Sequence, residues 1–273
     1  MIFSARYCFP RLLAGMLAVL ASAGAAEDFP INGVAAFGIL PGYPTEGHHM
    51  MAAQIRMKPG WKTYWRTPGS NGIPPVFDWS GSDNVKSVRF HWPAPKIYIE
   101  NGVRTIGYTR ELVLPIEVTP KTGDRPIRVA GTVSFGICKD VCLPVEARFS
   151  ATLDGQTHHR HIIQSALRAR PITARRAGLR ALSCDIYPAP GGVRITANME
   201  LRGISEPRFV VMEYTGANIR AEQGRTDVQG VQVQAVATLY PLTPAPLIID
   251  RSKLRLTVLG GARAVEVSGC PAG

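Results

Sequence analysis

The sequence predicts an all-β protein made of two sandwich-sized domains. Short runs that alternate apolar and polar residues recur along the chain, with 27 Gly and 22 Pro residues as punctuation. Such alternation is typical of half-buried strands. The clearest runs cover residues 53–57, 112–118, 127–137, 143–149, 193–197, 231–235 and 254–258. The chain length without a leader, about 245 residues, suits two β-sandwiches.

Residues 1–26 are typical of a secretory signal peptide. Arg6 and Arg11 give a basic start, residues 12–20 are apolar, and small residues follow at 21–26. The apolar run is too short to span a bilayer comfortably. Removal of Cys8 with the leader leaves four cysteines, an even number that suits an oxidising compartment. We therefore expect a soluble, exported protein that is periplasmic in a Gram-negative source.

The domain boundary is predicted from the only stretch with helical character, residues 158–170. Ile162, Ile163, Ala166 and Leu167 are spaced for one helix face, and Pro171 ends the pattern. We expect a first domain at 27–157, a helical connector at 158–181 and a second domain at 182–273.

The charge and the motifs exclude several functions. The net charge of +11 falls to +9 when the two leader arginines are removed. The basic residues are spread along the chain without interleaved stacking aromatics, which argues against a nucleic-acid partner. They are typical of a solvated basic surface that favours anionic membranes or acidic partners. The sequence has no Gly-x-Ser-x-Gly, no His-Glu-x-x-His and no phosphate-binding glycine loop, so hydrolytic functions lack support.

Two cysteines, Cys138 and Cys142, lie between the alternating runs 127–137 and 143–149. In an antiparallel hairpin Cys138 would lie opposite Cys142, and residues 134 and 132 opposite residues 146 and 148. Opposed Cα atoms lie about 4.5–5.5 Å apart, which suits a disulfide. The even positions are the polar ones, so both sulfur atoms are predicted on the wetter face, within reach of a partner.

The remaining plausible pair is Cys184 with Cys270. Chain entropy gives ~4.6 kcal/mol for that loop of roughly 87 residues and only ~2 kcal/mol for a five-residue loop. We therefore interpret Cys184–Cys270 as a structural disulfide and Cys138–Cys142 as a reactive one.

The first domain also carries a distinctive series of aromatic, proline and glycine residues. The series is Pro59-Gly60-Trp61, Tyr64-Trp65-Arg66-Thr67-Pro68-Gly69, Gly72-Ile73-Pro74-Pro75, Phe77-Asp78-Trp79, Trp92-Pro93-Ala94-Pro95, Gly107-Tyr108, Leu114-Pro115 and Cys138-x-x-x-Cys142-x-Pro144. Over residues 30–150 it resembles the N-terminal periplasmic domain of the DsbD thiol:disulfide interchange family, in particular the ScsB-like subgroup. The two-domain layout also resembles the periplasmic region of that subgroup.

The resemblance implies immunoglobulin-like β-sandwiches and a redox-active cysteine pair, with no bound cofactor or metal. It implies a thiol–disulfide oxidoreductase of the protein-disulfide reductase type. Cys142 takes the place of the cysteine that forms mixed disulfides, and Cys138 that of the resolving cysteine. The implied donor is an inner-membrane electron conduit on another polypeptide. The implied acceptors are periplasmic thioredoxin-fold proteins, including disulfide isomerases and cytochrome c maturation factors.

Members of this family shield the disulfide with a cap loop that carries a Phe and have five residues between the cysteines. Here three residues separate the cysteines, and the cap loop corresponds to residues 97–101, which contain no Phe. Tyr98 is the candidate shield in that loop. Tyr64 and Trp65 are further candidates, because they belong to an aromatic-rich segment that would dock or shield near the cysteines.

Two other functions fit parts of the sequence. A copper-handling protein would use residues 48–51 (His-His-Met-Met) and the histidines at 158, 159 and 161, because imidazole and thioether groups bind copper. Strand alternation would send His48 and His49 to opposite faces, which weakens that cluster. A structural interaction module would use both disulfides as passive staples.

Overall fold

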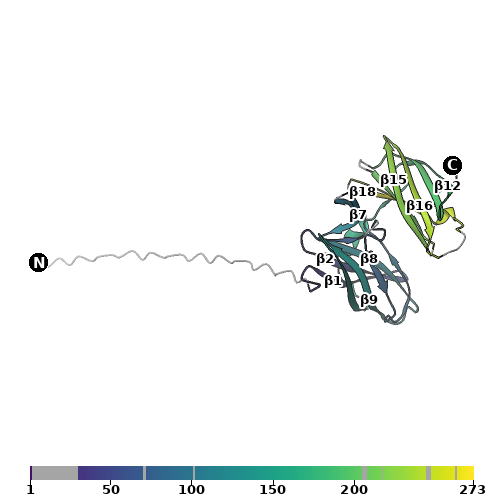
Figure 1. The fold of residues 1–273 in the computed structure, drawn as a ribbon. Coiled ribbons are helices and arrows are strands. Elements are labelled where there is room, and N and C mark those ends of the chain that lie inside the picture. The colour runs from purple at the N-terminus through teal and green to yellow at the C-terminus, as the bar shows by residue number, and fades with distance from the viewer. Residues whose placement is uncertain are drawn as a thin grey trace.

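The computed structural model describes residue 1 and residues 30–273, except residues 70–71, 101, 205–207, 217, 244–246 and 262. Apart from Met1, the predicted signal peptide at 1–26 lies outside the described residues. The described chain forms two β-sandwiches, each made of two sheets, and one α-helix (Figure 1). The predicted all-β class, with two immunoglobulin-like sandwiches joined by a short helix, is confirmed.

The first sandwich contains a four-stranded and a six-stranded sheet. The four-stranded sheet has the order β1 (Ala35–Thr45), β2 (His48–Met57), β8 (Glu111–Pro120) and β5 (Val85–Phe90). The other has the order β10 (Cys142–Leu153), β9 (Ile127–Cys138), β3 (Lys62–Tyr64), β7 (Val103–Thr109) and β6 (Lys96–Glu100), and β4 (Val76–Asp78) also pairs with β9. Strand β9 is therefore internal, whereas β10 and β6 are the edge strands.

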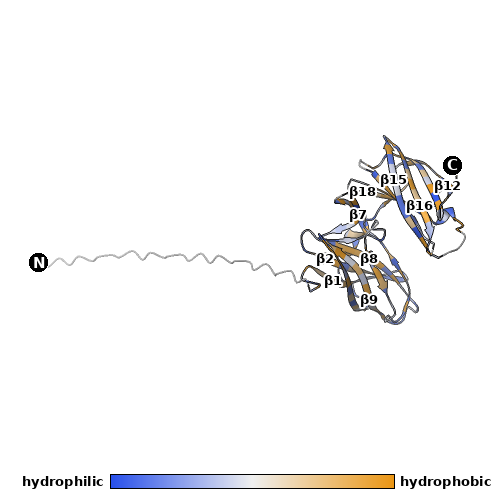
Figure 2. Cartoon of the chain, viewed as in Figure 1, coloured by the Kyte–Doolittle hydropathy of each residue, from blue (hydrophilic) through white to orange (hydrophobic). Residues whose placement is uncertain are grey.

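The second sandwich contains two four-stranded sheets. One has the order β11 (Ile172–Thr173), β18 (Arg263–Ser268), β17 (Leu254–Gly260) and β14 (Arg208–Tyr214). The other has the order β12 (Leu179–Ala189), β13 (Gly192–Leu201), β16 (Gln232–Pro241) and β15 (Ile219–Gln229), and a short 3₁₀ helix, Arg251–Lys253, precedes β17. In Figure 2 apolar and polar residues alternate along these strands, as half-buried strands require.

The connector is divided between the two domains. Helix α1 (Arg160–Arg168) packs on the first sandwich, where Ile163 is fully buried beside Tyr43 and Met50. The segment after the helix belongs to the second sandwich, because β11 pairs in parallel with β18. The helix thus packs against β1, β2 and β8 of the first domain, and the residues after Pro171 begin the second.

Apolar side chains from both domains meet at their interface. Phe209 and Val211 of β14, with Leu259 and Ala264, belong to the same buried cluster as the core of the first domain. The rest of the second domain has its own core between its two sheets. The second domain is therefore docked on the first through buried apolar contacts.

Candidate redox site

Strands β9 and β10 form a hairpin with the predicted register. Cys138 pairs with Cys142, Ser134 with Glu146 and Thr132 with Arg148. The two cysteines form a disulfide at the hairpin tip, with a Cα–Cα distance of 4.2 Å. Three residues, 139–141, make the turn. The period-two alternation of the sequence was sufficient to set this pairing.

The two cysteines differ sharply in exposure. Cys138 is 1% exposed, whereas Cys142 is exposed. The prediction that both sulfur atoms are within reach of a partner is therefore wrong for Cys138. Cys138 ends the internal strand β9, where Lys62 of β3 lies opposite it on the side away from Cys142. Cys142 begins the edge strand β10, which has a neighbour on one side only.

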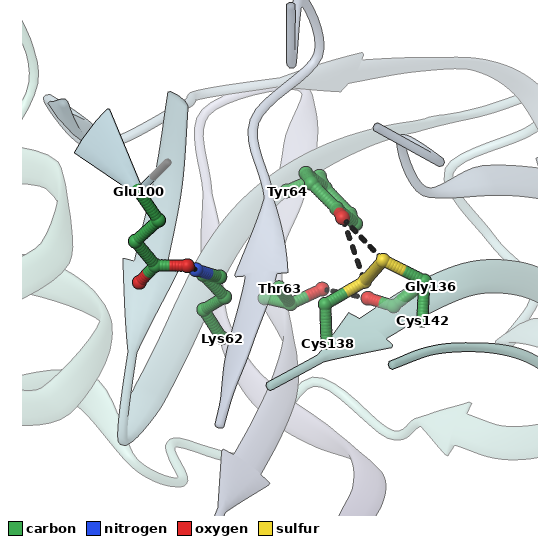
Figure 3. The surroundings of a disulfide bond; sticks show 7 residues. All are labelled: Lys62, Thr63, Tyr64, Glu100, Gly136, Cys138 and Cys142. Carbon is green, nitrogen blue, oxygen red and sulfur yellow. Dashed lines mark hydrogen bonds and ion pairs between the residues drawn. A yellow bond between two sulfur atoms is a disulfide. The ribbon is translucent and has the colours of Figure 1, made fainter. Parts of the chain in front are cut away.

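The side chain of Tyr64 covers the disulfide. Its hydroxyl lies 2.6 Å from Cys138 Sγ and 3.1 Å from Cys142 Sγ, and Figure 3 shows it pointing at both sulfur atoms. Burial, with a contribution from Glu100, raises the pKa of Tyr64, so the hydroxyl stays protonated at neutral pH and can donate to sulfur. Tyr64 is therefore both a lid over Cys138 and a hydrogen-bond donor to the pair.

A glycine makes room for this lid. A Cβ atom at Gly136 of β9 would lie 2.9 Å from Tyr64 Cε2 and 2.9 Å from Ile73 Cβ. The carbonyl of Gly136 also accepts a hydrogen bond from Thr63 Oγ1 at 2.8 Å, which fixes β3 beside β9. Only a residue without a side chain allows the ring to pack this closely on the strand.

The β6–β7 hairpin corresponds to the expected cap. Glu100 of β6 accepts a charged hydrogen bond from Lys62, whose side chain is only 7% exposed. This ion pair lies on the left in Figure 3, away from the sulfur atoms. Tyr98 lies near Lys62, with the ammonium 5.9 Å from its ring centroid, and its hydroxyl donates to Thr109 Oγ1 at 3.3 Å. The described residues of this hairpin therefore contribute Glu100 to an ion pair with Lys62 of β3, and the direct cover of the disulfide comes from Tyr64.

Trp65 does not shield the disulfide. Its side chain is 0% exposed and belongs to the core of the first domain. Adjacent residues on an extended segment point to opposite faces, so a Tyr64 that faces the sulfur atoms sends Trp65 inward. Sequence reasoning missed Lys62, Glu100 and Gly136, because their roles depend on contacts between strands far apart in sequence.

Cys184 and Cys270 form the second disulfide, with a Cα–Cα distance of 5.7 Å. Both residues are buried, at 0% and 2% exposure. The Cys184 amide donates to the Pro271 carbonyl at 2.8 Å, and Arg251 donates to the Cys184 carbonyl at 2.6 Å. This bridge ties the end of the second sandwich to β12, out of reach of a bulky partner.

Two of the histidines expected for copper, His49 and His158, have other partners. His49 is buried and its Nε2 lies 2.8 Å from the Pro41 carbonyl, while His158 pairs with Asp154 at 3.7 Å. Met51 is fully buried in the core. Among the described residues, no three His, Cys, Asp or Glu side chains are gathered in a group that could hold a metal ion.

Comparison with known proteins gives a family match to the first domain and a fold match to most of the chain. Residues 35–154 match the family model of the N-terminal domain of the thiol:disulfide interchange protein DsbD. The structure is similar to the N-terminal periplasmic domain of ScsB from Proteus mirabilis, with a TM-score of 0.63 and 20% identity over 88% of this chain and 92% of that chain. A second match is the reduced DsbD N-terminal domain of Neisseria meningitidis, with a TM-score of 0.28 and 17% identity over 45% of this chain and 88% of that chain. Comparison with curated proteins gives no match.

The similarity to ScsB shows that the fold is shared across both sandwiches. Within the described part of the chain, no helix has the length and apolar character needed to cross a membrane. The resemblance predicted from the sequence is confirmed: residues 35–154 match the DsbD N-terminal domain family model, and the fold matches that of an ScsB periplasmic domain.

Proposed function

We propose that this protein exchanges dithiols and disulfides with other proteins through Cys138 and Cys142, with Cys142 as the sulfur that partners contact. The observation that carries the proposal is the difference in exposure across one disulfide. A partner thiolate can approach Cys142, whereas Cys138 is buried under Tyr64. A passive staple has no need for an accessible sulfur, and this short bridge stabilises the fold by only ~2 kcal/mol.

The exchange proceeds by two displacements. A partner thiolate attacks Cys142 Sγ, a new S–S bond forms, and the electron pair of the old bond leaves on Cys138 Sγ. Tyr64 donates a hydrogen bond to this sulfur, which stabilises the thiolate as it develops. A second thiolate of the partner then attacks its own sulfur in the mixed disulfide and expels Cys142 as a thiolate. Two electrons and, after protonation, two protons have moved to the cysteine pair.

In the reverse direction the reduced pair donates electrons. The Cys142 thiolate attacks the disulfide of an acceptor, and Cys138, 4.2 Å away between Cα atoms, then attacks Cys142 Sγ and releases the reduced acceptor. In the proposed relay an inner-membrane electron conduit reduces the pair in the periplasm, and thioredoxin-fold proteins oxidise it. The family of residues 35–154 and the fold shared with a periplasmic ScsB domain support this assignment.

Trapping of mixed disulfides tests the proposal. Cys138→Ser leaves Cys142 without its resolving partner, so covalent complexes with thioredoxin-fold proteins are expected on non-reducing gels of periplasmic extracts. Cys142→Ser is the matched control, because it leaves only the buried Cys138 and should trap far less. Equal trapping by the two variants, or none by Cys138→Ser in cells with active partners, would contradict the proposal. A reduction potential below about −300 mV would instead identify a structural disulfide.

A further inference from the structure

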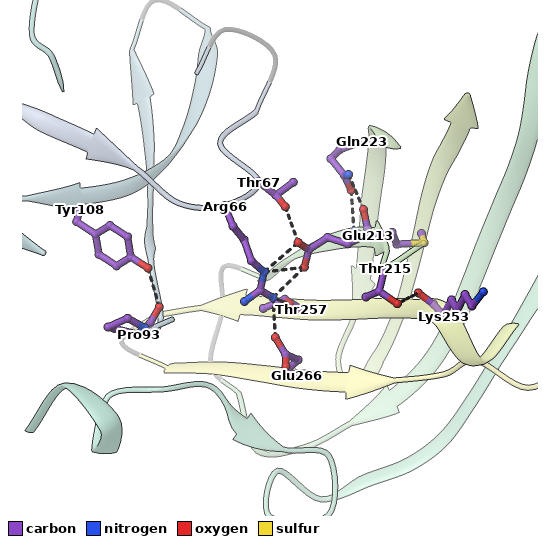
Figure 4. Close-up of polar contacts among 11 residues, drawn as sticks. Arg66, Thr67, Pro93, Tyr108, Glu213, Thr215, Gln223, Lys253, Thr257 and Glu266 are labelled. Carbon is purple, nitrogen blue, oxygen red and sulfur yellow. Dashed lines mark hydrogen bonds and ion pairs between the residues drawn. The ribbon is translucent and has the colours of Figure 1, made fainter. Parts of the chain in front are cut away.

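The residue that anchors the second domain lies two positions after Tyr64. The Arg66 guanidinium donates to both carboxylate oxygens of Glu213, at 2.9 Å from Nε and 2.8 Å from Nη2, and to Glu266 at 2.6 Å (Figure 4). Glu213 is on β14 and Glu266 on β18, so one side chain of the first domain bridges two strands of the second. The Arg66 side chain is 16% exposed and that of Glu213 14%. This cluster is therefore shielded from solvent and specific in geometry.

The segment between Tyr64 and this cluster is held on both sides. The Trp65 amide donates to the Ile106 carbonyl at 3.0 Å, and the Ile106 amide donates to the Pro68 carbonyl at 3.0 Å. The Thr67 hydroxyl adds a bond to Glu213 at 2.6 Å. The Arg66 guanidinium also stacks over the ring of Trp65, 4.3 Å from its centroid. A shift of the cluster would thus be transmitted along a short, well-bonded stretch to Tyr64.

A second contact fixes the neighbouring strand. The Arg104 guanidinium of β7 lies over the ring of Phe209 of β14, 3.8 Å from its centroid. Strand β7 pairs with β3, where Gly107 lies opposite Tyr64. Strand β7 and the segment that directly follows β3 are therefore both in contact with the second domain.

We propose that Arg66 is a positioning residue through which the second domain holds the Tyr64 hydroxyl against Cys138 and Cys142. The inference deepens the proposed function, on which it rests for the role of the cysteine pair. The second domain then becomes part of the redox site without contacting sulfur. When the cluster of Arg66, Glu213 and Glu266 is intact, the Tyr64 hydroxyl is in place to stabilise the Cys138 thiolate as it leaves. Attack at Cys142 is then faster.

The rate of reduction by dithiothreitol tests this inference without any protein partner. The change is followed at the Cys138–Cys142 peptide by alkylation and mass spectrometry, which separates it from the buried Cys184–Cys270 bridge. Tyr64→Phe keeps the ring but removes the donor, and we expect reduction about fivefold slower, the value of one ordinary hydrogen bond. Arg66→Leu and Glu213→Gln should slow it in the same direction.

A double-mutant comparison separates positioning from general destabilisation. If Arg66 acts through the Tyr64 hydroxyl, Arg66→Leu should cause no further slowing in the Tyr64→Phe background. Glu213→Gln keeps the shape of the side chain and replaces Arg66→Leu in this comparison if Arg66→Leu fails to fold. Arg225→Leu is the control, because Arg225 makes an exposed ion pair with Asp227 in the second domain; its rate should equal that of the parent.

The pH dependence of Cys142 alkylation in the reduced protein is a further test, because it would not change if Arg66 had a purely structural role. Loss of the donor should shift the alkylation profile toward higher pH in Tyr64→Phe and in Arg66→Leu alike. Folded Arg66→Leu and Glu213→Gln proteins with parental rates and profiles would overturn the inference, as would additive effects of Arg66→Leu and Tyr64→Phe. Absence of trapped partners would overturn the proposed function and leave these rates unaffected.

Discussion

Removal of the Cys184–Cys270 disulfide should destabilise its domain about twice as much as removal of Cys138–Cys142 destabilises the other. The cysteines are 86 residues apart in the first pair and 4 apart in the second. Loop-closure entropy then gives about 4.6 kcal/mol for the long loop and about 2 kcal/mol for the short one. A loss of the first size is a large share of the stability of a typical domain.

The second domain should nevertheless remain folded without its disulfide. The hydrogen bonds from the Cys184 amide to Pro271 and from Arg251 to the Cys184 carbonyl do not depend on the sulfur atoms. They hold the C-terminal segment against β12 in the native state. The bridge acts mainly on the unfolded chain, so its loss should lower the free energy of unfolding and leave the native structure in place.

Urea unfolding of two matched variants measures the difference. All four tryptophans, at positions 61, 65, 79 and 92, lie in the first domain, so their fluorescence follows that domain alone, while circular dichroism follows both. Cys184→Ala/Cys270→Ala should lower the urea midpoint of the second domain only, which is the transition seen by circular dichroism without a change in fluorescence. Cys138→Ala/Cys142→Ala should shift the fluorescence transition by the smaller amount. Equal losses, or a larger loss in the first domain, would refute the loop-length reasoning.

Two further predictions concern the first domain. Gly136→Ala places a Cβ 2.9 Å from the Tyr64 ring, so we expect the free energy of unfolding in urea to fall by about 1–3 kcal/mol and the disulfide to be reduced more slowly. The control is Gly38→Ala on β1, where a Cβ meets open space, and it should leave the reduction rate unchanged. Equal reduction rates in the two variants would contradict the packing argument. Burial, the largest cause, lowers the pKa of both His49 and His91 from 6.5 in the folded protein. Below about pH 6.5 the unfolded chain therefore binds more protons than the folded protein, which destabilises the fold. The urea concentration at the midpoint of the fluorescence transition should decrease as the pH is lowered from about 7 to about 5. A midpoint that increases over this interval would contradict the burial of the two histidines as neutral groups.

The sequence was sufficient for the most strongly alternating strands, such as β9 and β10, and for the register of the cysteine hairpin. Both follow from local alternation, because a register slip of one residue would move Val133, Phe135 and Ile137 out of the core. The two-sandwich class follows from the number of such strands. The resemblance of the first domain rested on residues that lie close together in sequence, such as those at 59–69.

The Tyr64 lid and the ion cluster of Arg66 could not be predicted from local alternation. Arg66 contacts residues 147 and 200 positions away, and Tyr64 contacts sulfur atoms 74 and 78 positions away. Such pairs depend on which strands become neighbours and on how two domains dock, and alternation within one strand carries no information about either. Alternation therefore does not decide among Tyr64, Trp65 and Tyr98 as the lid, because that choice depends on the order of the strands.

The exposure of each cysteine also depends on the order of the strands. Alternation places both sulfur atoms on one face of the sheet, but it does not distinguish an internal strand from an edge strand. Cys138 is flanked by β10 and β3, and β3 brings Tyr64 over it, whereas Cys142 has no strand on its outer side. A symmetric motif in the sequence thus becomes an asymmetric disulfide, with Cys142 exposed and Cys138 buried beneath Tyr64.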